Sequence, residues 1–546
     1  MAETSAWTEQ LDLLFAAWDR PDSPGCALAV YREGEIVYQR GYGTAHLEHG
    51  VPIVPQTVFH VASISKQVTA LAVALLAREG RLALDDDVRR YVPELPAGPA
   101  ITLRQILHHT SGLRDQWDLL RLAGFRHADL KTTRDIVWLA ARQQGLNFEP
   151  GSRFQYINTG YTLLGVAVER ITGRTLRQYT EERITRPLGM HSTFFQDDHQ
   201  EVIPRRAQAY SRDRAGRIVI DMPDYETVGP TGLLSTVEDF ARWERNFLAP
   251  TVGDEELIRQ VVTPGLLEDG RPTSYGLGVV AGQYRGLPTV EHAGGDAGYR
   301  AHFLRFPEER FAVAVFANFG EVQPGKLARE VAGVCLAGRL AGESSGSGDV
   351  LAWAGRAVGL DALAAEELES MAGPYRESTG GITCRVEHRG GRLFLIAPGE
   401  IEYELAPLGE RRFRFLGSDV DCLFQPGEGA SPRWRIVVFH GGAETAVCER
   451  IDEPTAALDG GGAEYAGGYW SDELEALYTL VDRDGELLLE RPRAAPAPLR
   501  LQAPDQFSDG DGKLHFRFQR GEEGRVQGLT VSAERVWNVR FVRDTR

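Results

Sequence analysis

The pattern of apolar residues changes near residue 341, and this change constrains the fold more than any other feature of the chain. Up to that point, apolar residues recur at helical spacing in long segments. Beyond it, short alternating segments separated by glycine and acidic turns are typical of strands. The stretch from Gly342 to Gly348 has the glycine-rich and serine-rich composition of a linker. We therefore predict a unit with helices over 1–340, a linker at 341–350 and a strand-rich remainder.

A weak internal repeat marks the strand-rich remainder. The stretch from Gly373 to Tyr375 leads into strand-like segments, and the stretch from Gly467 to Tyr469 does the same further along. A gap rich in proline and glycine separates the two copies. We predict two antiparallel β-barrels, at 351–453 and 463–546, joined by a linker at 454–462. One large sandwich is the alternative, but the restart of the repeat after the gap favours two barrels.

Ser63 and Lys66 form an S-x-x-K motif at the head of a long apolar helix pattern. Residues three apart lie on the same face of a helix, so the lysine can take the proton of the serine hydroxyl. The helix dipole favours developing negative charge in the first turn, and a buried lysine loses its proton more easily. The tetrapeptide alone is a weak signal, because a helix start with a solvated lysine is common. Its apolar context makes the pair a candidate catalytic unit.

Two further stretches indicate a polar cleft. Tyr156 and Asn158 project to the same side of an extended segment, which offers a phenol and an amide for proton relay and substrate binding. Between two strand-like segments, His292 precedes Gly294 and Gly295, and glycines there let a substrate backbone lie against a strand edge. The structural alternatives are a half-buried tyrosine beside a turn asparagine and a plain glycine-rich connection.

These three stretches resemble the S-x-x-K, Y-x-N and H-x-G elements of the serine beta-lactamase and penicillin-recognising family (class C type), over residues 6–340. The resemblance implies an α+β fold, with an antiparallel sheet flanked by helices and the site between the sheet and a helical subdomain. In this family, Ser63 would be the nucleophile, and Lys66 and Tyr156 would share the proton transfers. The resemblance also implies that Asn158 and His292 bind the substrate, and that the N–H groups of Ser63 and Gly295 form an oxyanion hole.

The two barrels narrow the resemblance to the D-aminopeptidase type of this family, whose barrels are lipocalin-like. In that type a loop of the last barrel reaches over the active site, and the equivalent loop here is 490–498. This loop is basic and rich in proline, with no acidic residue past Glu490. Because a substrate ammonium group prefers a carboxylate, Asp115 or Asp296 would have to supply one instead.

The charge balance disfavours several classes of partner. The formal net charge is −17, which argues against nucleic acid and anionic membrane surfaces. No signal peptide is evident, and no apolar run approaches the roughly 20 residues of a membrane span. Five scattered cysteines argue against a disulfide framework and a metal site. We therefore expect a cytoplasmic protein with no cofactor and no metal.

These features predict a serine hydrolase that acylates Ser63 and releases the acyl group to water. The expected substrates are small peptides, amides or esters, and release of an amino-terminal D-residue is the leading interpretation. An esterase or broad amidase using the same residues is one alternative, and a noncatalytic binding protein on this fold is another. The sequence leaves the oligomeric state open, a homodimer included.

Overall fold

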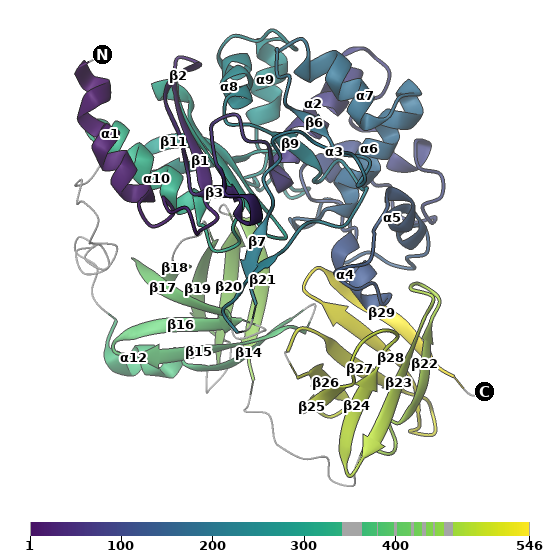
Figure 1. The fold of residues 1–546 in the computed structure, drawn as a ribbon. Coiled ribbons are helices and arrows are strands. Elements are labelled where there is room, and N and C mark those ends of the chain that lie inside the picture. Colours follow the sequence, from purple (N-terminus) through teal and green to yellow (C-terminus); the bar gives the residue numbers. More distant parts are fainter. Residues whose placement is uncertain are drawn as a thin grey trace.

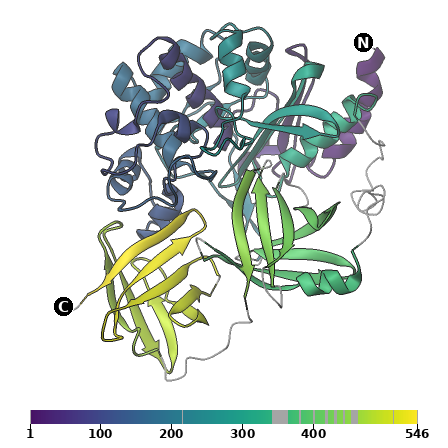
Figure 2. The same ribbon diagram turned by 180° about the vertical axis from the view of Figure 1, so that it is seen from behind.

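The computed structural model describes residues 2–213, 215–340, 363–378, 381–397, 401–415, 420–427, 433–440, 443–451, 462–510 and 512–544. Figure 1 shows a sheet with helices in the N-terminal part and two barrels after it, and Figure 2 shows the same arrangement from behind. The predicted fold class is confirmed. The predicted linker at 341–350 and, apart from Gly462, the one at 454–462 lie outside the described residues.

An antiparallel sheet forms the centre of the N-terminal part, with its strands in the order β10, β11, β12, β13, β1 and β2. Cys26 of β1 pairs with Ala317 of β13, which joins the beginning and the end of this part into one sheet. Strand β1 is almost wholly apolar and buried, as expected of a strand inside the sheet. The bounds are β1 (Cys26–Arg32), β2 (Glu35–Tyr42), β10 (Val280–Tyr284), β11 (Leu287–Asp296), β12 (Tyr299–Phe306) and β13 (Phe311–Ala317).

Helices cover both faces of the sheet. On one face, α1 (Ala2–Phe15) and α10 (Pro324–Cys335) pack around a core that includes Leu11 and Val331. On the other face, α2 (Ser65–Arg78) and α6 (Thr159–Thr172) share a second core with the sheet. In the described ranges, no helix is long and apolar enough to cross a membrane.

Shorter elements connect these layers. They are β3 (Thr44–His46), η1 (Leu47–His49), β4 (Val51–Pro52), β5 (Phe59–His60), η2 (Ala62–Ile64), η3 (Val88–Arg90), α3 (Leu103–Leu107), α4 (Gln116–Leu122), α5 (Thr133–Ala140), α7 (Leu176–Thr180), η4 (Glu181–Thr185), β6 (Phe194–Phe195), β7 (Tyr210–Arg212), β8 (Ile218–Ile220), β9 (Leu233–Ser235), α8 (Asp239–Leu248), α9 (Glu255–Val262) and η5 (Pro307–Glu309).

The strand-rich remainder folds into two closed barrels, formed by β14 to β21 and by β22 to β29. Each barrel closes because its first strand pairs with its last, which leaves no open sheet edge. Tyr375 and Tyr469 occupy equivalent buried places in the first strands. Their hydroxyls donate to the carbonyls of Met371 and Tyr465, four residues earlier in each case. This structural match accounts for the repeat in the sequence.

The bounds in the first barrel are α12 (Ala365–Met371), β14 (Gly373–Glu377), β15 (Thr383–Arg389), β16 (Arg392–Ala397), β17 (Ile401–Gly409), β18 (Arg412–Phe415), β19 (Val420–Pro426), β20 (Trp434–His440) and β21 (Ala443–Arg450). Those in the second barrel are β22 (Gly467–Ser471), β23 (Ala476–Arg483), β24 (Glu486–Glu490), β25 (Ala497–Ala503), β26 (Gln506–Asp509), β27 (His515–Arg520), β28 (Val526–Ala533) and β29 (Val536–Arg543).

The second barrel docks on α4 and α5 of the N-terminal part, as Figure 1 also shows. Leu119 of α4 and Leu139 of α5 belong to the same apolar cluster as the barrel interior. Tyr478 of β23 donates its hydroxyl to the last carbonyl of α4 at 2.8 Å. A buried ion pair between Arg114 and Glu473, 2.5 Å apart, crosses the same interface. The barrel is therefore fixed against α4 and α5.

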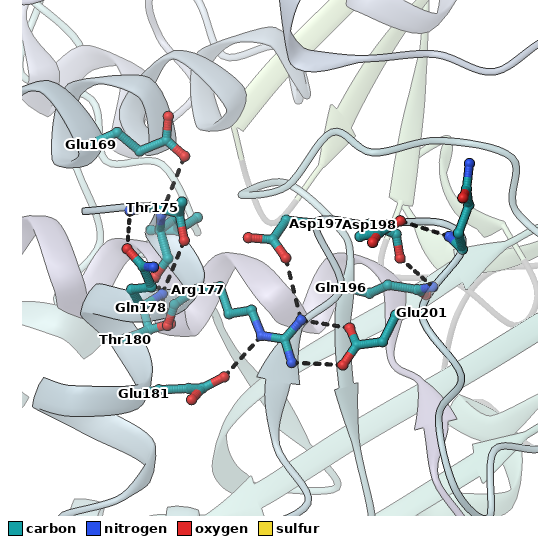
Figure 3. Close-up of polar contacts among 12 residues, drawn as sticks. Glu169, Thr175, Arg177, Gln178, Thr180, Glu181, Gln196, Asp197, Asp198 and Glu201 are labelled. Carbon is teal, nitrogen blue, oxygen red and sulfur yellow. Dashed lines mark hydrogen bonds and ion pairs between the residues drawn. The ribbon is translucent and has the colours of Figure 1, made fainter. Parts of the chain in front are cut away.

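A polar network around Arg177 ties α7 to the segment that follows β6 (Figure 3). The Arg177 guanidinium pairs with Glu181, Asp197 and Glu201, at 2.9, 3.3 and 2.6 Å. The side-chain bonds to these carboxylates, that to Glu201 foremost, raise the pKa of Arg177. Several carboxylates sharing one guanidinium hold the segment from Asp197 to Glu201 against the helical part.

Candidate active site

Ser63 lies in η2, the short turn that leads into α2. The preceding residue, Ala62, has a φ of 48°, in the left-handed region that alanine rarely adopts. Strand β11 approaches this turn closely, because a Cβ on Gly294 would lie 2.3 Å from the Val61 carbonyl oxygen. The fold therefore holds a strained turn that presents the Ser63 hydroxyl at the N-terminus of α2.

Lys66 lies one turn after Ser63 and is fully buried. Its Nζ is 3.2 Å from the Ser63 Oγ. It also donates to the Asn158 Oδ1 and to the Pro230 carbonyl, both at 2.9 Å. Burial lowers the pKa of Lys66 well below its usual range, while the Asp115 carboxylate opposes this shift and the Arg535 guanidinium adds to it. An amine with so low a pKa is a suitable base for the serine proton.

The Tyr156 hydroxyl is buried beside Ser63. Burial raises the pKa of this phenol, and the Ser63 hydroxyl only partly offsets the effect, so the phenol stays protonated. It makes no hydrogen bond of normal geometry with any residue that the structure describes. The Lys66 Nζ lies 4.7 Å from the centre of the Tyr156 ring. A protonated phenol in this place can pass a proton on from the lysine side.

Asp115 is a fully buried carboxylate that organises the site. Its Oδ2 accepts hydrogen bonds from the backbone N–H and the side-chain amide of Asn158, at 2.7 and 3.0 Å. Its Oδ1 caps α4 by accepting the Trp117 N–H at 3.0 Å. These contacts fix the Asn158 amide with its oxygen toward Lys66. Asp115 is consequently unable to serve as the contact for a substrate ammonium group.

A cavity of about 530 Å³ opens in front of these groups. Ser63, Tyr156 and Asn158 line it, together with Gly295 of β11 and Asp296 at the end of that strand. The remaining lining residues are Trp117, Leu120, Arg121, Phe125, Arg126, His127, Lys131, Pro223, Asp224, Tyr225, Thr231, Ala297 and Arg535.

His292 has surroundings that the sequence did not indicate. Its Nε2 lies 2.7 Å from the Tyr275 hydroxyl, and its Nδ1 lies 2.6 Å from the Ala293 carbonyl oxygen. Burial lowers the pKa of His292 to about 3, so the ring is neutral. Its ring centre lies 6.1 Å from that of Tyr156, and it is absent from the described lining of the cavity. Both ring nitrogens are engaged within the protein, and substrate binding by His292 stays a prediction.

The second barrel reaches the cavity through a segment that the sequence did not mark, and the cover by the loop 490–498 stays a prediction. In the loop 490–498, Pro492 lies beside Gly124, and Arg493 is 3.6 Å from Asp129. None of this loop belongs to the described lining. The barrel instead reaches the cavity with Arg535, in the turn between β28 and β29. No motif marks Arg535 in the sequence, because only the docking of the barrel brings it there.

One group of side chains in the described chain has the make-up of a metal site. Asp198, His199 and Glu226 hold their ligand atoms within 4.8 Å of one another. Asp198 and His199 are exposed, and the His199 Nδ1 already lies 2.5 Å from the Glu226 Oε1. Exposed acidic residues gather in this way without a metal, so we assign no ion to this place.

The comparisons with known proteins agree with this fold and place the chain in a family. The family model named Beta-lactamase matches residues 12–335, more than half of the chain. The solved octameric penicillin-binding protein homologue from Pyrococcus abyssi has the same fold, with a TM-score of 0.55 and 23% sequence identity. That match covers 82% of this chain and 99% of the other. The chain belongs to the beta-lactamase family.

Relatives that match most of the chain are named for one activity. The chain is 26% identical over 465 residues to the D-aminopeptidase of Gluconobacter oxydans, covering 85% of this chain and 82% of that protein. It is 28% identical, with the same coverage, to the D-aminopeptidase of Cereibacter sphaeroides. Together with the family match, these relatives show that the chain is a serine hydrolase.

Proposed function

We propose that this serine hydrolase acylates Ser63 and releases amino-terminal D-residues from short peptides or amides. The observation that carries the proposal is the fully buried Lys66, whose Nζ lies 3.2 Å from the Ser63 Oγ. A noncatalytic binding protein would not need a buried amine of lowered pKa against a serine held in a strained turn.

In the proposed reaction, neutral Lys66 accepts the proton of Ser63 while the Ser63 Oγ attacks the carbonyl carbon of the substrate. The negative charge on the carbonyl oxygen is stabilised by the backbone N–H groups of Ser63 and Gly295. Tyr156 passes a proton to the leaving amine and regains it from Lys66. Water then attacks the acyl-enzyme by the reverse of these transfers, which frees the acid and Ser63.

Asp296 is the proposed contact for the substrate ammonium group. It lines the cavity next to Gly295, and its Oδ2 accepts hydrogen bonds from the hydroxyls of Tyr225 and Thr231. Within the described chain, its Oδ1 has no hydrogen-bond partner. A carboxylate fixed through one oxygen can offer the other to an ammonium group. The preference for D-residues is supported by the names of the relatives.

The direct test compares D-alanine and L-alanine p-nitroanilides with p-nitrophenyl acetate. We expect kcat/KM for the D-anilide to exceed that for the L-anilide by about tenfold or more. Asp296→Asn should raise KM for both aminoacyl substrates and spare the acetate ester, which has no ammonium group. Hydrolysis of the ester alone would contradict the proposal. So would an unchanged KM for the aminoacyl substrates in Asp296→Asn.

Location and assembly complete the proposal. The five cysteines are free, which suits a reducing cytoplasm, and we propose a cytoplasmic location. Cell fractionation tests this location.

We propose a homodimer as the simplest assembly. Light scattering on the purified chain would contradict it by showing a monomer, or an octamer like that of the Pyrococcus abyssi homologue.

A further inference from the structure

The turn between β28 and β29 is bound firmly to the rim of the cavity. The Arg535 carbonyl accepts hydrogen bonds from the Asp115 N–H at 3.0 Å and the Asn147 side-chain amide at 2.9 Å. The Arg535 N–H donates to the Asp118 Oδ2 at 3.0 Å. The Trp537 N–H donates to the Asn147 Oδ1 at 2.8 Å. Backbone bonds on both sides thus fix where the Arg535 side chain begins.

Arg535 is a charged residue of the cavity that Ser63 and Tyr156 also line. Burial alone would lower its pKa, but the carboxylates of Asp115, Asp118 and Glu534 outweigh burial and raise it. The side chain keeps 25% of its surface exposed, and the residue lines the cavity.

Asp115 forms an ion pair with Arg535 through one oxygen only. The Arg535 Nη1 lies 3.3 Å from the Asp115 Oδ2, and the same oxygen accepts both N–H groups of Asn158. Among the described residues, Asp115 is the one ion-pair partner of the Arg535 side chain. The buried Nε of Arg535 has no hydrogen-bond partner there. A guanidinium has five N–H donors arranged to bind a carboxylate through two of them.

The other cations of the cavity are already engaged. Arg121 lies 3.0 Å from Asp118, and Arg126 lies 2.7 Å from Asp129. Lys131 donates to the carbonyls of His127 and Asp129, at 2.5 and 2.8 Å. Arg535 is therefore the cation of this cavity best suited to take an anionic group of the substrate.

We propose that Arg535 is a specificity-determining residue that binds a carboxylate of the substrate. Resting on the proposed function, this inference defines the preferred substrates as short D-aminoacyl peptides that carry an ammonium group and a carboxylate. Asp296 binds the first group and Arg535 the second. The carboxylate is the chain end of a dipeptide or an acidic side chain, and the two sources can be separated by experiment.

The test uses the full chain and matched pairs of substrates. D-Alanyl-D-alanine is compared with its carboxyl-terminal amide, and the p-nitroanilide of D-aspartic acid with that of D-asparagine. We expect a carboxylate to raise kcat/KM by about tenfold or more in one pair, mainly through KM. Arg535→Gln should bring that ratio close to one, and Arg535→Lys should keep part of it. Arg525→Gln, at an exposed site of the same barrel, is the control and should keep the ratio.

Several results would overturn the inference. The inference fails if the wild-type kcat/KM is nearly equal for the two members of each substrate pair. It also fails if Arg535→Gln lowers kcat/KM equally for both members of each pair. The latter result would mean that Arg535 only positions Asp115. If no aminoacyl substrate is cleaved, the proposed function fails, and p-nitrophenyl monosuccinate against p-nitrophenyl butyrate still measures carboxylate binding. Unfolding scans on each variant show that it is folded.

Discussion

Removing Glu473 should loosen the second barrel from the rest of the molecule. Arg114 and Glu473 keep only 4% and 2% of their side-chain surface exposed, at 2.5 Å from each other. Glu473 also accepts the backbone N–H groups of Gln144 and Arg540, at 2.9 and 3.0 Å. Glu473→Ala would leave the Arg114 cation buried without its partner. Arg114 also donates to the Asn538 carbonyl at 3.3 Å, so the disturbance would extend to the strand that follows Arg535.

The expected magnitude follows from this burial. Breaking a buried ion pair by removing one partner costs about 3–5 kcal/mol in free energy of unfolding. The pair Arg142 and Glu475 crosses the same interface at 2.8 Å, but its side chains are 34% and 47% exposed. Glu475→Ala should therefore cost only about 0.2–1 kcal/mol.

Urea unfolding followed by tryptophan fluorescence measures both variants. A double-mutant cycle adds Arg114→Met alone and with Glu473→Ala. The combined loss should fall short of the sum of the single losses by about 2 kcal/mol or more, because no uncompensated charge remains. If Glu473→Ala matches Glu475→Ala within error, the buried pair does not hold the barrel and this reasoning is refuted.

Three further predictions concern the site. Lys66→Ala and Tyr156→Phe should each lower turnover by about 100-fold or more. Because both residues act on one proton path, the double variant should lose much less turnover than the product of the two single losses. Full additivity of these losses in steady-state assays would contradict this. The neutral form of Lys66 is the active one and its pKa is lowered, so kcat/KM should fall as the pH drops through that pKa. Arg535→Gln removes a cation that disfavours protonated Lys66, so it should move this acid limb to higher pH; a pH profile that does not move would refute the coupling. Replacing residues 491–496 with a glycine linker should leave the ranking of bulky and small esters unchanged, because these residues do not line the described cavity, and a changed ranking would show that the loop closes over the site.

The sequence predicted the parts that depend on local pattern. The apolar helix pattern after Ser63 and the repeated barrel starts at Tyr375 and Tyr469 follow from spacing and turns, and the structure confirms the sheet, the helices and both barrels. The spacing of S-x-x-K also put Lys66 on the same side as Ser63. Such features involve residues close together in the chain, where periodicity is informative.

The parts that depend on docking were out of reach. The sequence offers Asp115 as a contact for the ammonium group, but the structure shows its carboxylate engaged by Asn158 and Arg535. Arg535 lies more than 400 positions after Asp115, and no local signal links the two. His292 matches a family position, yet its hydrogen bond to Tyr275 appears only when β11 meets the segment before β10. Long-range packing, which leaves no periodic trace, decides these contacts.

The central claim is that the Ser63 hydroxyl is the activated nucleophile. Treatment of the full chain with a fluorophosphonate, followed by intact mass and peptide mapping, tests it most directly. We predict one adduct per chain, on Ser63, and none in Ser63→Ala. The neighbouring Ser65 serves as an internal comparison, because its buried hydroxyl is bound to the Ala62 carbonyl and the Leu233 N–H. Labelling of Ser65 or any other serine, or unchanged uptake by Ser63→Ala, would contradict the account.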